Sequence, residues 1–221
     1  MVRNNYLFLL CIFLSCHRAG NISSEGSFHP GIRELEAWHQ QDLAPEHFQQ
    51  WVKEPEHGLL QTKKIDNVEY SLLCKPVDYI ISKEAGNGKV SASEYARKIE
   101  ELSDLIYFDL RIKIDHCNGE FLKYGVSSSE EYQDRVAYSA FAMQQDIRLV
   151  SGGDSIPCSL FHFERAFDVV PYGNFLMGFS ADPATLKDLT FVFHDNLLQK
   201  GIIKFSVDPR LLTHLPKLKT S

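Results

Sequence analysis

Two histidines and three carboxylates are the residues of this chain best suited to chemistry. His162, Glu164 and Asp168 lie close together in the sequence, and His194 is followed directly by Asp195. Residues two apart in a strand point to one face, so His162 and Glu164 share a face, and a second strand could bring His194 beside them. Imidazoles and carboxylates bind divalent metals and move protons near neutral pH. The set therefore predicts one candidate site, that of a hydrolase or a metal-dependent enzyme.

A structural role fits the same residues. Their spacing matches neither the helix-borne HExxH pattern nor the serine elbow of hydrolases. Arg165 stands between Glu164 and Asp168, so these charges also suit ion pairs on the solvated face of a sheet. The sequence leaves both interpretations open.

The start of the chain has the pattern of an export signal. Residues Tyr6–Ser15 carry no charge and are mostly large and apolar, with Arg3 ahead of them. A membrane-spanning helix needs about 20 such residues, so this run is too short to span. A positive start, a short apolar core and then small residues are typical of a secretion signal.

The end of this apolar run, Phe13-Leu14-Ser15-Cys16, resembles the lipobox of bacterial lipoprotein precursors. The resemblance implies that the Cys16 thiol is acylated and that the chain is cut just before it. It also implies a membrane anchor without a spanning helix, and His17 at the next position, where Asp is absent, favours the outer membrane of a cell envelope. An ordinary signal peptide, cut near Ser15 or Ala19, is the alternative.

The resulting domain organisation has three parts. Residues 1–15 form the signal peptide, and residues 16–30 a lipidated tether, which is small and polar and cannot bury enough apolar surface to order itself. Residues 31–221 are long enough for a single α+β domain with a real core.

Charge and cysteine content narrow the function classes. A net charge of −6, spread without long runs, argues against nucleic acid or anionic lipid as the main partner. Cys74, Cys117 and Cys158 show no spacing typical of zinc, so no metal or other cofactor is expected. Three thiols allow either one disulfide and a free thiol or three free thiols, and their spacing does not decide between these states.

Helices are predicted at four places. Apolar residues recur at three to four positions near 31–41 and 45–53, which predicts two short helices. Ser91–Glu94 and Ser127–Glu130 have the spacing of a capping box, in which a serine hydroxyl and a glutamate satisfy free amides of the first turn. These boxes predict longer helices near 91–105 and 128–145.

Strands are predicted from alternating apolar residues and from turn signals. Leu59–Ile65 and Val68–Cys74 form a hairpin around Asp66-Asn67, since both turn residues tolerate the left-handed backbone. Further strands are predicted at 77–82 (after Pro76, either an edge strand or a bulged continuation), 106–114, 147–150, 158–163, 166–170, 175–180, 189–195 and 201–207, with a glycine-rich turn at 151–155. The fold class is therefore α+β, a mainly antiparallel sheet with the two capped helices on one face and short N-terminal helices.

We expect the domain to be a non-enzymatic binding or accessory module whose partners are the membrane, through Cys16, and an envelope protein. The alternative is an envelope hydrolase or metal-dependent enzyme that uses His162, Glu164 and His194. A third hypothesis is a ligand carrier lined by aromatic strand residues, although alternating phenylalanines are more often core. The residues concerned are Phe161, Phe163, Phe175 and Phe179.

Overall fold

The computed structural model describes residues 29–86 and 88–221. The predicted signal peptide (1–15), Cys16 and the tether up to residue 28 lie outside the described residues. The last two tether residues, His29 and Pro30, pack against the domain: Pro30 is buried, and its carbonyl accepts a hydrogen bond from Arg210 at 3.0 Å.

Most strands belong to two antiparallel sheets. The five-stranded sheet has the order β2-β3-β4-β8-β7, and the four-stranded sheet has the order β10-β9-β5-β6. Two short strands, β1 and β11, pair in parallel and tie residues near the C-terminus to the N-terminal region. The bounds are β1 Asp42–Leu43, β2 Leu60–Ile65, β3 Val68–Lys75, β4 Ile106–Ile114, β5 Ile147–Ser151, β6 Asp154–Pro157, β7 Leu160–Glu164, β8 Tyr172–Phe179, β9 Leu189–Asp195, β10 Gly201–Val207 and β11 Lys217–Leu218.

The two larger sheets pack face to face over an aromatic core. Phe191 of β9 contacts Phe108 of β4 and Phe179 of β8, with ring centroids 5.7 and 6.3 Å apart. At one edge, the Gln61 side chain of β2 donates to the Ser206 carbonyl of β10 at 2.8 Å. The predicted strands are thus divided between two sheets, because alternation tells which face of a strand is buried and not which sheet it joins.

The four phenylalanines considered for a ligand cavity contribute to this core. Phe175 and Phe179 are fully buried, and Phe161 and Phe163 are partly buried against the core. Phe163 stacks on Phe175 with centroids 4.8 Å apart. These rings pack against one another and against other core side chains, and they occupy the space that a ligand cavity would need.

Both capped helices form where serine can cap them. The Ser91 hydroxyl accepts from the Glu94 amide at 3.2 Å, as predicted. The second capping box lies one residue later than predicted, because the Ser128 hydroxyl accepts from the Glu131 amide. The helical elements are α1 Ile32–His39, α2 Pro45–Lys53, α3 Val77–Ala85, α4 Ala92–Leu102 and α5 Ser129–Ala137, and α5 continues into a π-helical turn, η3 Tyr138–Ala142, and a 3₁₀ turn, η4 Met143–Asp146.

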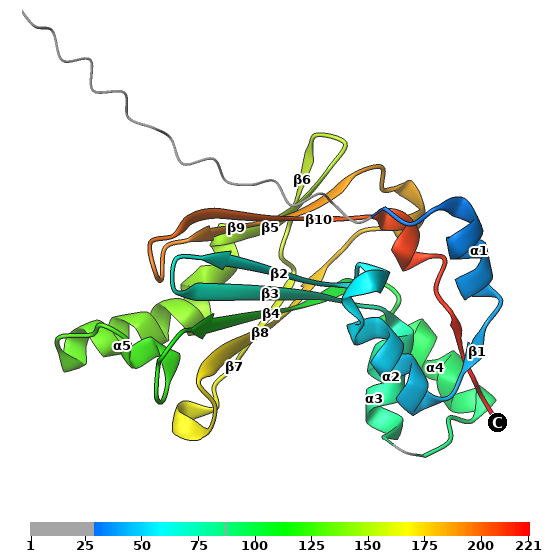
Figure 1. Cartoon of the computed structure of the whole chain (residues 1–221), viewed down its shortest axis with the longest axis horizontal. Helices are drawn as coiled ribbons and strands as arrows, with labels where there is room; N and C mark the ends of the chain where they lie inside the picture. Colours follow the sequence, from blue (N-terminus) through cyan, green and yellow to red (C-terminus); the bar gives the residue numbers. More distant parts are fainter. Residues whose placement is uncertain (1–28, 87) are drawn as a thin grey trace, which may run out of the picture.

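The α+β class with mainly antiparallel sheets is confirmed. Figure 1 shows α1 to α4 gathered at one end of the sheets and α5 at the other, so the two capped helices do not form one covering layer. No helix within residues 29–86 and 88–221 has the length and apolar character required to cross a membrane.

Two predicted strands are wrong. Val77–Ser82 lies in α3, since Pro76 sets the extended backbone that precedes a helix and the run buries Tyr79 and Ser82, which are three residues apart. The segment 166–170 is mostly a 3₁₀ turn, η5 Phe167–Val169. The Asp168 carboxylate accepts a hydrogen bond from the Glu120 amide at 2.9 Å, so a loop contact holds this segment.

The cysteines of the domain are free thiols. Cys74 and Cys158 are buried and Cys117 is half-buried. This excludes the alternative in which two of these three form a disulfide within the described structure.

Candidate functional site

The structure places the two histidines on opposite sides of the molecule. In β7, Phe161 and Phe163 face the core, so His162 between them points outward from the five-stranded sheet. In β9, Phe193 is buried and His194 points outward from the four-stranded sheet. Facing sheets pack about 10 Å apart, whereas a metal holds its ligands at about 2 Å. One site that uses both His162 and His194 is therefore not formed.

The remaining carboxylates of the set have structural partners. Asp195 is 1 % exposed and accepts hydrogen bonds from the Tyr70 hydroxyl and from the amides of Leu197 and Leu198. Glu164 is exposed and accepts from the Asn174 side chain. The described part of the chain contains no group of three His, Cys, Asp or Glu placed to hold a metal ion.

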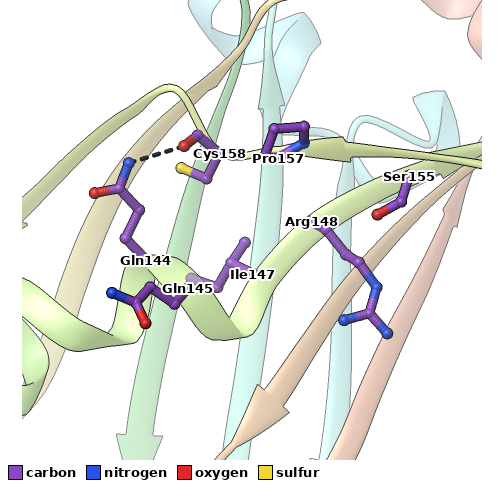
Figure 2. Close-up of a pocket in the computed structure, with 7 residues that line it drawn as sticks. All are labelled: Gln144, Gln145, Ile147, Arg148, Ser155, Pro157 and Cys158. Carbon is purple, nitrogen blue, oxygen red and sulfur yellow. Dashed lines mark hydrogen bonds between the residues drawn. The ribbon is translucent and has the colours of Figure 1, made fainter.

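A shallow depression of about 450 Å³ lies where η4 meets β5 and β6. Figure 2 shows the glutamines 144 and 145 on one side of it and Arg148 with Ser155 on the other, so their polar ends do not converge on one point. Gln144 is already engaged, because its amide donates to the Cys158 carbonyl at 2.8 Å.

Cys158 lines the same depression and is not an activated nucleophile. Burial raises the pKa of its thiol to about 11, so the thiol stays protonated at neutral pH. Its Sγ also lies 3.0 Å from the Leu160 carbonyl, to which it donates. The depression therefore offers polar contacts without a reactive group.

The most distinctive exposed feature is the segment 165–169 between β7 and β8, which we call the apolar loop. Its two apolar side chains, Phe167 and Val169, are 59 % and 84 % exposed. The Phe167 ring packs under the Arg165 guanidinium, whose carbon lies 4.4 Å from the ring centroid. Single exposed apolar residues are ordinary on protein surfaces. Here two of them lie on either side of Asp168, in a turn that several side-chain contacts fix in place.

A buried glutamate holds the start of the apolar loop. Glu120 is 4 % exposed, and its carboxylate accepts from Arg165 Nε at 3.0 Å and from the Tyr132 hydroxyl at 2.6 Å. A buried charge is expensive unless it is paired and hydrogen-bonded, and this one is both. The hydrogen bond to Glu120, together with burial, raises the pKa of the Tyr132 hydroxyl, which therefore stays a donor.

Asp168 holds the middle of the apolar loop. One carboxylate oxygen accepts from the Glu120 amide at 2.9 Å, and the other from Lys123 Nζ at 2.7 Å. These two hydrogen bonds keep the pKa of Asp168 below its usual value. Gly119 permits this approach, because a Cβ there would lie 3.0 Å from the Asp168 carboxylate.

The backbone of the apolar loop is strained at Phe167. Its φ is +49°, a left-handed conformation that costs a bulky residue about 1–2 kcal/mol. Such conformations persist where surrounding contacts hold them, and they are frequent at binding and active sites. The hydrogen bonds of Arg165 and Asp168, on either side of Phe167, keep the backbone in this conformation.

Sequence reasoning missed this loop. The short apolar run with Val169 and Val170 predicts a strand at 166–170. The signals against a strand were Asp168 inside the run and Pro171 directly after it. Glu120 and Tyr132 gave no signal, since each is far from Arg165 in the sequence.

Comparison of the chain with protein-family models, with curated proteins and with solved structures finds no match.

Proposed function

We propose that the chain is a lipid-anchored protein of a bacterial cell envelope, held at the outer membrane through Cys16. Its folded part acts as a non-enzymatic module that binds another envelope protein through the apolar loop. The lipobox-like Phe13-Leu14-Ser15-Cys16 supports the anchor. The partner presents an apolar recess that accepts Phe167 and Val169.

The observation that carries the binding role is the combination of exposure and fixation in the apolar loop. Most binding free energy at protein interfaces comes from a few residues that are placed before the partner arrives. Phe167 and Val169 are exposed, while Arg165 and Asp168 fix the backbone around them. The partner then does not have to order this segment on binding.

The position of the loop favours a protein partner over the anchoring bilayer. Residue 29, which leads back to the anchor, bonds to Asp208 directly after β10. Figure 1 shows β10 along the upper side and the turn that follows β7 at the lower side, with both sheets between them. A loop on the side opposite residue 29 is placed to meet a second protein.

Photo-crosslinking in the living cell tests this role. A photoreactive phenylalanine at position 167 should give one adduct of defined mass with an envelope protein, and Val169→Ser in the same chain should reduce that adduct at least several-fold. The control is the same photoreactive residue at Ile32, which is also well exposed but lies on α1.

An adduct at position 167 that does not respond to Val169→Ser, or one of equal yield from position 32, would count against the loop as the binding site. The stability of each variant is checked by urea unfolding, and Val169→Ser should leave the midpoint unchanged because its side chain is almost fully exposed.

A further inference from the structure

The outer face of the four-stranded sheet is uncovered and has its own charge pattern. Figure 1 shows no helix above β9 and β10. The outward positions of its paired strands hold two cations, one histidine, one proline, three hydroxyl side chains and three aliphatic side chains, and no carboxylate. These residues are Arg148, Val150, Ser155, Pro157, Thr190, Val192, His194, Ile202, Lys204 and Ser206.

The two cations lie on either side of Val192, Arg148 on the inner strand β5 and Lys204 on the edge strand β10. Arg148 and Lys204 are the partners of Val192 on its two sides, and Val192 is buried although it points outward. The aliphatic stems of long basic side chains can cover such a residue while their charges stay in solvent. Neither cation forms an ion pair within residues 29–86 and 88–221, whereas Arg97, Arg135, Arg165 and Arg210 each do.

The outer face of the five-stranded sheet differs in composition. Lys64 and Lys75 there pair with Asp115 and Asp109, at 2.6 and 3.1 Å. The four-stranded sheet, by contrast, has cations and no carboxylate at the outward positions of its paired strands, and the exposed Ile202 lies on its edge strand β10.

The tether leaves the domain beside this basic face. His29 bonds to Asp208 at 3.3 Å, and Asp208 directly follows β10. The chain from Cys16 to residue 29 can span at most about 45 Å even when fully extended. An anchor at Cys16 would thus keep residue 29, beside this face, within about 45 Å of the lipid headgroups.

We propose that the outer face of the four-stranded sheet rests on the surface of a bilayer that contains anionic phospholipid. This inference rests on the proposed function, because the lipid at Cys16 supplies the main attachment. Arg148 and Lys204 meet phosphate groups, Ile202 enters the headgroup region, and the apolar loop then points away from the membrane. Each basic side chain near an anionic surface contributes about fivefold in affinity.

The test uses the mature, lipid-bearing protein, purified after processing in the cell and reconstituted in vesicles of phosphatidylcholine, alone or mixed with phosphatidylglycerol. In a Cys117→Ser background, an environment-sensitive fluorophore is attached at Ile202→Cys or at Val169→Cys. A lipid-bound quencher should reduce the signal from position 202 several-fold more than that from position 169, and only in the vesicles with phosphatidylglycerol.

Arg148→Glu with Lys204→Glu should abolish that difference, while the vesicles still carry the protein. The matched control is Lys53→Glu with Lys113→Glu, two exposed cations away from this face, and it should keep the difference. Equal quenching at both positions in vesicle-bound protein would overturn the basic face as the contact and leave the anchor standing. Protein that does not attach to vesicles at all would overturn both proposals.

Discussion

The hydroxyl of Tyr70 in β3 donates a hydrogen bond to the carboxylate of Asp195 in β9, and both residues are buried between the two sheets. Asp195 also accepts hydrogen bonds from the amides of Leu197 and Leu198 in the turn that leads to β10. Burial and the hydrogen bond to Asp195 raise the pKa of Tyr70 far above its usual range, so the phenol remains a donor. Asp195, which the sequence suggested as a group for proton transfer, thus links the two sheets through Tyr70.

Tyr70→Phe should destabilise the domain by about 1.5–3 kcal/mol, because it removes a hydrogen bond to a buried charged group. Urea unfolding measures the change. Tyr79→Phe is the matched control, since Tyr79 is also buried but its hydroxyl has no hydrogen-bond partner among the described residues, and it should cost less than about 0.5 kcal/mol. Equal losses for both variants would contradict a stabilising link between the sheets.

Glu120→Gln should loosen the apolar loop, because it removes the charge that holds Arg165. We expect a loss of about 1–3 kcal/mol in unfolding free energy and faster hydrogen exchange of the amides at 165–169.

The control for this change is Glu36→Gln on the exposed side of α1, which should leave both quantities unchanged. Unaltered exchange at 165–169 in the Glu120 variant would show that the buried glutamate does not hold the loop.

Asp208 should make stability depend on pH. Burial opposes its ionisation, but hydrogen bonds from Arg210 and His29 outweigh burial and hold the pKa of Asp208 below its usual value. A carboxylate with a lowered pKa stabilises the folded state above the pKa of the unfolded chain, near 4, and that contribution is lost as the pH falls through the lower folded value.

Asp208→Asn should therefore cost about 1–2 kcal/mol at pH 7, and its difference from the unchanged protein should shrink as the pH falls below about 4. Urea unfolding at several pH values measures both. A difference that stays constant down to pH 3 would contradict a role for the charge.

Gly173→Ala should be strongly destabilising. A Cβ at position 173 would lie 2.3 Å from the buried Phe121 ring, which has no room to move between Phe163 and Phe175. We expect a loss of about 2 kcal/mol or more in urea unfolding. Gly31→Ala is the control, because a Cβ there meets no atom within 4 Å, and its effect should stay within about 0.5 kcal/mol.

Local signals in the sequence were sufficient for several elements. The hairpin of β2 and β3 turns at Asp66, whose φ is +53°, as its turn residues predict. The cap at Ser91 and the pairing of β9 with β10 also follow from short-range patterns. Such features depend on neighbouring residues, so spacing alone indicates them.

Features that depend on distant residues could not be predicted in this way. Alternation correctly placed the inward and outward faces of β7 and β9, but it did not show that His162 and His194 belong to different sheets. The contact of Glu120 with Arg165 joins residues from separate loops. A strained φ at Phe167 likewise results from the contacts around it, and an isolated sequence gives no sign of it.

The lipid anchor at Cys16 is the central claim, and the intact mass of the protein purified from membranes tests it most directly. The account predicts a chain that begins at Cys16 and carries the added mass of a diacylglycerol group, with or without a further acyl chain, and a Cys16→Ser variant that leaves the membrane fraction. A chain that keeps residues 1–15, or one that begins elsewhere without added lipid mass, would contradict it.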